Sequence, residues 1–210
     1  MNPFHRARKI AQLICAGELR TLRYSLWVRW KGLDFSGESC EKLGLPATSV
    51  AEHAHSAGPQ LEELIQKLNV SKESNIIDLG SGKGLAAITL SKEFQHVLGV
   101  ELHPGLVEVS RRNVAKLGIK NISFLCSDAG TFRGFDEFTY VYMFNPFSES
   151  VMIEVMKNLN VSLQSKAREM TIIYKNPSCH QILVDAGFVL VGKIQYPHTH
   201  PFNIYRKQSL

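Results

Sequence analysis

Four polar side chains follow four successive apolar runs of the chain, and their positions suggest where chemistry would occur. These side chains are Asp78, Glu101, Asp128 and Asn145. Short runs rich in β-branched and aromatic residues are typical of buried parallel strands. Ligands of open α/β sheets bind at the carboxyl ends of such strands. We therefore expect the four side chains at one edge of a sheet, around a single ligand site.

A glycine-rich turn follows the first of these runs. Gly80, Gly82 and Gly84 alternate with Ser81 and Lys83, and a helical pattern begins after them. Glycine permits positive φ and lets a ligand approach bare backbone. A strand, a glycine turn and a helix together form the nucleotide-binding opening of an open α/β sheet. The turn is therefore expected to hold one end of the ligand.

Three kinds of ligand compete for this turn. A P-loop requires Gly-x-x-x-x-Gly-Lys-Ser/Thr, which the sequence lacks because Leu85 follows Gly84. A dinucleotide site requires Gly-x-Gly-x-x-Gly/Ala, and counted from Gly80 the last position is again Leu85. An NAD-linked oxidoreductase is therefore disfavoured. The remaining pattern, Asp78-x-Gly80-x-Gly82-x-Gly84, resembles the first motif of class I S-adenosylmethionine-dependent methyltransferases.

The resemblance covers about two-thirds of the chain, from roughly residue 74 to 206. It implies S-adenosyl-L-methionine as cofactor, with Glu101 accepting both ribose hydroxyls and Asp128 near the adenine amino group. A carboxylate about 20 residues past the glycines is placed for that ribose contact. The implied cofactor-binding residues are Asp78, Gly80, Ser81, Gly82, Gly84, Glu101, Leu102, Asp128, Ala129 and Asn145.

The elements expected between these motifs agree with the fold that the resemblance implies. That fold is an α/β, Rossmann-like three-layer αβα sandwich whose seven-stranded, mostly parallel sheet has an antiparallel last strand inserted beside the fifth. Strands are predicted at 76–77, 97–100, 122–126, 140–144, 170–174, 188–194 and 202–205, and helices over 61–68, 104–117 and 148–159. Ser178 is predicted to cap a short further helix.

The fourth strand is expected to end at the methyl acceptor. Asn145-Pro146-Phe147 resembles the Asn/Asp-Pro-Pro-Tyr/Phe tetrapeptide of amino-group methyltransferases, with one proline where that motif has two. The resemblance implies that Asn145 accepts a hydrogen bond from a target amine and that the aromatic ring stacks on a planar substrate. These three residues are the catalytic candidates. The alternative is a plain turn, because Asn-Pro commonly ends a strand.

A narrower resemblance connects the chain to a poorly characterised group of bacterial class I methyltransferases. The shared patterns are Asp-Leu-Gly-Ser-Gly-Lys-Gly, Gly-Val-Glu, Phe-Asn-Pro-Phe and Tyr-x-Asn-Pro, found here at 78–84, 99–101, 144–147 and 174–177. Leu33-Asp34-Phe35-Ser36-Gly37 resembles an element upstream of the domain in that group. This resemblance supports the cofactor and leaves the acceptor open.

Composition indicates an ordinary globular chain. Apolar residues make up 44% and charged residues 20% of 210 residues, enough apolar content to bury a full core. Cys15, Cys40, Cys126 and Cys179 lie far apart, without metal-ligand spacing. We interpret them as reduced thiols of an intracellular, cytoplasmic protein. No apolar stretch is long enough to cross a bilayer.

The first part of the chain is unusually basic. Residues 1–33 contain seven Lys/Arg and one Glu, a net charge of +6, whereas the whole chain carries +5. Residues 1–58 are predicted as a basic helical arm with a lid or linker, and residues 59–210 as the methyltransferase domain. The arm is expected to pack as a solvated helix, or to contact nucleic acid or an anionic surface. A transit peptide is disfavoured because serine is scarce.

Two histidine pairs invite other interpretations. His53 and His55, with Glu52 and Ser56, precede the first domain helix, where related enzymes often carry a lid; a plain surface loop is the alternative. His198 and His200 lie between the last two strands and are expected near the substrate mouth. No Cys joins either pair, so no metal site is predicted.

Two functions remain from the sequence. The first is methyl transfer from S-adenosylmethionine, to nitrogen on a protein, a nucleic acid or a small planar molecule. The second is a non-catalytic protein that binds the cofactor and uses its basic arm to hold a partner. Replacing Asn145 separates them, because only the first function requires this side chain.

Overall fold

The computed structural model describes residues 19–35, 58–197 and 199–208. The helices are α2 (Leu19–Trp30), α3 (Pro59–Leu68), α4 (Leu85–Leu90), α5 (Pro104–Leu117), α6 (Glu149–Ser165) and α7 (His180–Asp185). The strands are β1 (Asn75–Leu79), β2 (His96–Glu101), β3 (Ile122–Cys126), β4 (Tyr140–Phe144), β5 (Glu169–Lys175), β6 (Val189–Ile194) and β7 (Phe202–Gln208).

The strands form one seven-stranded sheet in the order β3-β2-β1-β4-β5-β7-β6. β1 to β5 are mutually parallel, and β7 lies antiparallel between β5 and β6. The order reverses between β1 and β4, which makes this edge the switch point where ligands of open sheets bind. The predicted fold and the insertion of the last strand are confirmed.

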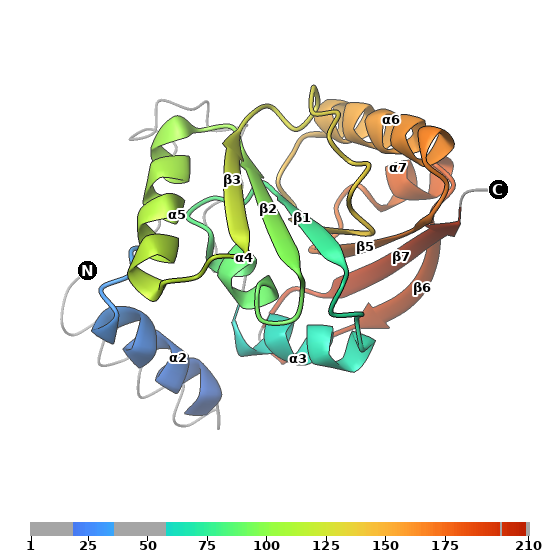
Figure 1. Cartoon of the computed structure of the whole chain (residues 1–210). Helices are drawn as coiled ribbons and strands as arrows, with labels where there is room; N and C mark the ends of the chain where they lie inside the picture. Colours follow the sequence, from blue (N-terminus) through green and yellow to red (C-terminus); the bar gives the residue numbers. More distant parts are fainter. Residues whose placement is uncertain (1–18, 36–57, 198, 209–210) are drawn as a thin grey trace.

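Helices cover the two faces of the sheet separately (Figure 1). α3, α4 and α5 cover one face, over a core that includes Leu64, Ile88 and Val107. α6 and α7 cover the other face, over a core that includes Met152 and Leu183. The central parallel strands are buried on both faces, between two helical layers, which explains why their sequences are nearly continuously apolar.

One aromatic ring determines where the sheet requires glycine. The ring of Phe124 on β3 lies over Gly99 of β2, where an added Cβ would be 2.5 Å from the ring. The same ring reaches Gly84, where an added Cβ would be 2.9 Å away. Phe124 therefore packs the start of α4 against β2, and both glycines leave space for it.

The described part of the basic arm packs on the domain. Tyr24 and Trp27 of α2 contact the same core as α3, α4 and α5. The Asn113 side chain accepts from the Asp34 N–H at 3.0 Å and donates to the Asp34 carbonyl at 2.9 Å. These bonds attach the segment after α2 to α5. The domain boundary near residue 58 stays a prediction.

Several predictions fall on residues outside the described ranges. They concern Glu52, His53, His55 and Ser56 of the predicted lid, the first 18 residues of the arm, Cys15, Cys40 and His198. Of the two described cysteines, Cys126 is exposed, Cys179 is buried, and both are free thiols. Within the described ranges, no helix combines the length and apolar character needed to span a membrane.

Candidate active site

Backbone N–H groups of the glycine turn donate hydrogen bonds to carbonyl groups of the protein itself. The N–H groups of Gly80 and Ser81 both donate to the Val100 carbonyl of β2, at 2.8 and 3.1 Å, and the Gly84 N–H donates to the Ser81 carbonyl at 2.9 Å. Gly80 and Gly84 have φ values of 75° and 85°, which glycine adopts without steric cost. The turn is thus fastened to the next strand along the sheet edge.

Glu101 closes the turn from the tip of β2. One carboxylate oxygen accepts from the Gly82 N–H at 2.9 Å, and the other accepts from the His103 N–H at 3.0 Å. A carboxylate has about four acceptor positions, so both oxygens can accept further bonds. Phosphate binding needs inward-pointing N–H donors and no adjacent negative charge. This turn therefore suits a phosphate-free ligand with hydroxyl groups better than a nucleotide phosphate.

Asp78 lies buried beneath the turn, with 2% of its surface exposed. The Ala87 N–H of α4 donates to its carboxyl group. Its Oδ2 has no hydrogen-bond partner within the described chain. Burial, and to a lesser extent the neighbouring Glu101 carboxylate, together raise the pKa of Asp78 to about 7. Such a group favours a positively charged ligand, because a cation would compensate the two carboxylates.

The remaining predicted cofactor residues differ in exposure and in hydrogen bonding. Leu102 is 57% exposed directly after Glu101. Asp128 is exposed and its Oδ1 accepts from the Gly130 N–H at 2.7 Å. Ala129 is buried in the core beneath α6, so only its backbone can face a ligand. Ser81 is also buried, and its hydroxyl points toward Gly99 and has no described partner.

The end of β4 touches the glycine turn. A Cβ added to Gly80 would lie 2.5 Å from Cβ of Pro146, so glycine is required for this close approach. The preceding residue, Asn145, is half-buried and has φ 38°, in the left-handed region that side chains other than Asn and Asp rarely adopt. The structure therefore brings the predicted acceptor residue beside the predicted cofactor turn.

Ser178 holds the Asn145 side chain, a contact that the sequence did not reveal. Its hydroxyl donates to Asn145 Oδ1 and lies 3.4 Å from the Tyr174 hydroxyl. The prediction that Ser178 caps a helix was wrong, because α7 begins at His180 and Cys179 is its N-cap. The spacing of apolar residues does not distinguish Ser178 from Cys179 as the cap. In the structure the Ser178 hydroxyl is hydrogen-bonded to Asn145 instead of to the helix.

Two aromatic rings flank this end of the sheet. Phe147 packs partly against the core beneath α6. Phe144 points to the other face, where Lys175 Nζ lies 4.7 Å from its centroid and the His200 ring lies 5.6 Å away. Lys175 is buried, and this burial lowers its pKa to about 8. Phe202 also contacts the ammonium group, at 5.3 Å.

The described histidines contact other groups of the protein. His103 Nδ1 accepts from the Gly105 N–H at 3.2 Å and thereby caps α5. Within residues 19–35, 58–197 and 199–208, no group of three or more His, Cys, Asp or Glu could hold a metal ion. His200 lies against the end of β4, where the sequence placed the substrate mouth.

The fold is that of Rossmann-like proteins, and several solved methyltransferase structures share it. A methyltransferase from Aquifex aeolicus described as SAM-dependent has a TM-score of 0.57 at 18% identity, covering 72% of this chain and 94% of that one. A Pyrococcus abyssi tRNA (uracil-54, C5)-methyltransferase in complex with S-adenosyl-L-homocysteine has a TM-score of 0.54 at 20% identity, covering 72% and 39%. At these identities the likeness shows the fold.

Sequence comparison gives the family. Residues 76–166, somewhat less than half of the chain, match the family model described as "Methyltransferase domain". A probable cobalt-precorrin-6B C(15)-methyltransferase (decarboxylating) of Methanocaldococcus jannaschii is 30% identical over 88 residues, 42% of this chain and 44% of that protein. A protein-L-isoaspartate O-methyltransferase of Thermotoga maritima is 32% identical over 92 residues, 42% and 28%.

The solved structures support the cofactor by their titles, and the curated relatives leave the acceptor open. The chain spans less than half the length of either curated relative. Their names assign them a carbon and an oxygen acceptor. The predicted resemblance to S-adenosylmethionine-dependent methyltransferases is confirmed, and the narrower bacterial group stays a prediction.

Proposed function

We propose that this protein transfers the methyl group of S-adenosyl-L-methionine to a nitrogen atom presented beside Asn145. The observation that carries the proposal is the contact of Pro146 with Gly80, with Glu101 closing the same turn. The contact places the residue resembling the amine-binding asparagine next to the turn resembling the cofactor motif. Proximity of nucleophile and methyl group is the main requirement of this reaction.

The residues of the turn fit this cofactor. Glu101 would hold the ribose hydroxyls, since both its oxygens retain acceptor capacity. A Cβ at Gly82 would meet no atom within 4 Å, so this side of the turn offers space for the amino-acid end of the cofactor. Asp78, with an oxygen lacking a described partner, supplies negative charge to a cationic ligand. Leu102 would contact the adenine.

Asn145 would orient the acceptor. The bound cofactor supplies a methyl group on a positively charged sulfur. The acceptor nitrogen forms a bond to this carbon with its lone pair, the carbon–sulfur pair goes to sulfur, and the nitrogen releases a proton. Asn145 Oδ1, already fixed by Ser178, would accept from the acceptor N–H and so direct the lone pair toward the methyl group.

Replacement of Asn145 tests the proposal. N145A should abolish transfer of labelled methyl groups to components of a cell lysate, while calorimetry should give unchanged affinity for S-adenosylhomocysteine. The matched control is N69A, because Asn69 at the end of α3 also has positive φ, 47°, and lies outside the site. Both variants should lose similar stability, and only N145A should lose transfer.

Three outcomes would contradict the proposal at different points. Cofactor binding by wild type without any labelled acceptor would favour a binding protein without turnover. Full transfer by N145A would remove this side chain from the reaction. Tighter binding of NAD than of S-adenosylhomocysteine, measured side by side, would contradict the cofactor.

A further inference from the structure

The positive charge of the molecule is concentrated on two neighbouring elements. Residues 19–35 contain four Lys/Arg and one Asp, and residues 104–121 contain four Lys/Arg and one Glu. These segments carry a net charge of +6, whereas the whole chain carries +5. Everything else in the chain is therefore close to neutral or slightly acidic, and the basic charge identifies one side of the protein.

The basic side chains of α2 and α5 are exposed and belong to one surface. We call this surface the α2–α5 face, and its described cations are Arg23, Arg29, Lys31, Arg111, Arg112, Lys116 and Lys120, all exposed. Lys116 Nζ donates to the Gly32 carbonyl at 2.5 Å, which joins α5 to the turn after α2. Figure 1 shows α2 and α5 on the same side of the molecule, away from α6.

The α2–α5 face is connected to the candidate active site at two places. α5 begins three residues after Glu101, with His103 as its cap. The Asn113 side chain, which holds the segment after α2, also donates to the Lys83 carbonyl in the glycine turn at 3.1 Å. A long ligand lying on the α2–α5 face would therefore pass close to the cofactor residues.

The chemistry of the face favours phosphates over a lipid surface. Membrane binding by an amphipathic helix requires a broad apolar face. Of the described large apolar residues that are exposed, only Leu26 and Trp30 lie on this face, and none lies on α5. Trp30 is 78% exposed, and Lys31 Nζ lies 4.5 Å from its ring centroid. An exposed aromatic ring among cations is how proteins bind single-stranded nucleic acid, through base stacking and backbone charge.

We propose that the α2–α5 face binds single-stranded nucleic acid, with its cations on the phosphates and Trp30 stacked on a base. This partner would deliver the acceptor to the end of β4, so its role as substrate depends on the proposed methyl transfer. Binding itself does not, because the face contains none of the residues assigned to the cofactor or the acceptor.

A binding experiment without cofactor tests the proposal. Fluorescence anisotropy would follow a labelled RNA strand of about 20 nucleotides at salt concentrations of about 50 to 200 mM. The variant R23Q/R29Q/K31Q/K120Q should bind at least tenfold more weakly and show a smaller dependence on salt. W30A should weaken binding of the single strand several-fold and leave binding of duplex RNA nearly unchanged.

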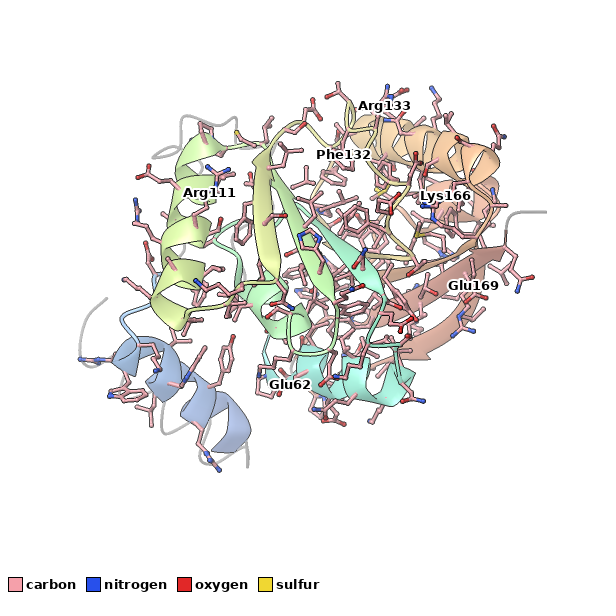
Figure 2. The ribbon with its side chains drawn as sticks, viewed as in Figure 1. Glu62, Arg111, Phe132, Arg133, Lys166 and Glu169 are labelled. Carbon is pink, nitrogen blue, oxygen red and sulfur yellow. The ribbon has the colours of Figure 1, made fainter. Side chains whose placement is uncertain are left out.

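A matched variant controls for net charge. K157Q/K166Q/K193Q/R206Q also removes four positive charges, from α6 and its C-cap, β6 and β7, and all four side chains are exposed. Figure 2 places Arg111 of the α2–α5 face and Lys166 on opposite sides of the molecule. This variant should retain RNA binding within about twofold, and melting temperatures should show that both variants fold.

Several outcomes would overturn the proposal. Equal losses in the two quadruple variants would show a nonspecific effect of net charge. Absence of RNA binding by wild type, or binding through α2 only to vesicles of anionic phospholipid, would exclude nucleic acid as the partner. Because the assay contains no S-adenosylmethionine, each of these results leaves the proposed methyl transfer intact.

Discussion

The two halves of the sheet edge are built differently. At β1 and β2, neighbours in sequence form the site: the turn binds Val100, and Glu101 closes it within about 20 residues of the glycines. At β4 and β5, the site depends on contacts between distant segments, such as Ser178 with Asn145. A local motif therefore describes the first half, whereas the motif of the second half omits Ser178, the residue that holds Asn145.

The difference parallels the two tasks of a methyltransferase. A cofactor common to many enzymes can be held by one local arrangement of backbone and carboxylates. An acceptor that differs between enzymes requires side chains that vary independently. The left-handed backbone of Asn145 and Asn176, each followed by proline, fits this contrast, since unusual φ values often mark functional positions. Replacing residues of each half tests whether the halves act separately.

A change at Gly80, where the two halves of the site touch, should have the largest effect on binding and transfer. G80A should abolish both cofactor binding and methyl transfer, because the new Cβ would overlap Pro146 and glycine's φ of 75° would be lost. The conformational cost is about 1–2 kcal/mol, and overlap adds about 1–3 kcal/mol. Calorimetry and thermal unfolding measure both effects.

G118A is the matched control for this change. Gly118 has φ 66° and an added Cβ would meet nothing within 4 Å, so only the conformational cost applies. It should lower the melting temperature and leave binding unchanged. Equal behaviour of the two variants would show that the Pro146 contact is unimportant.

Removing the charge of Glu101 should affect the first half alone. In E101Q one of the two backbone N–H donors would face the side-chain NH2 group instead of a carboxylate oxygen. Loss of a charged hydrogen bond costs about 1.5–3 kcal/mol, so the affinity for S-adenosylhomocysteine should fall roughly 10- to 150-fold. Calorimetry should find E154Q, an exposed change on α6, indistinguishable from wild type. Retention of affinity in E101Q would exclude Glu101 from ribose binding.

Removing the Ser178 hydroxyl should affect the second half alone. S178A frees Asn145 Oδ1 from its donor, and a net cost of about 1 kcal/mol corresponds to roughly a five- to tenfold lower kcat. The KM for S-adenosylmethionine should not change, and S178T should restore kcat because it retains the hydroxyl. A rise in this KM without a fall in kcat would show that Ser178 belongs to the cofactor half.

The smallest effect concerns the protonation of Asp78. With its pKa raised to about 7, the carboxyl group becomes neutral as the pH falls below 7 and then attracts a cationic ligand less. The affinity for S-adenosylmethionine should fall by less than tenfold between pH 8 and 6, as measured by calorimetry. D78N should remove this dependence on pH.

The same group should influence stability in the opposite sense. A carboxyl whose pKa is raised on folding stabilises the folded state fully below its ordinary value of 3.8, and this contribution is lost as the pH rises through about 7. D78N should therefore melt at a higher temperature than wild type at pH 8. If D78N instead melted at a lower temperature than wild type at pH 8, Asp78 would contribute stability as an anion.

Much of the molecule was predictable because strand and turn signals are local. The runs ending at Asp78, Glu101 and Asn145 predict buried strands, and their parallel order places the tips at one edge. The glycines at 80, 82 and 84 exclude a P-loop by spacing alone. These signals depend on residues within about ten positions of one another, which a sequence displays directly.

The sequence alone thus determined the class of fold, the insertion of the last strand beside the fifth, and the glycine turn with the carboxylates that end the neighbouring strands. Only the tertiary structure revealed the Pro146–Gly80 contact, the hold of Ser178 on Asn145, and the single basic face made by α2 and α5. The physical reason is the range of the interactions. Hydrogen-bonding and packing patterns within one element repeat along the chain, whereas contacts between elements depend on how the sheet brings distant residues together.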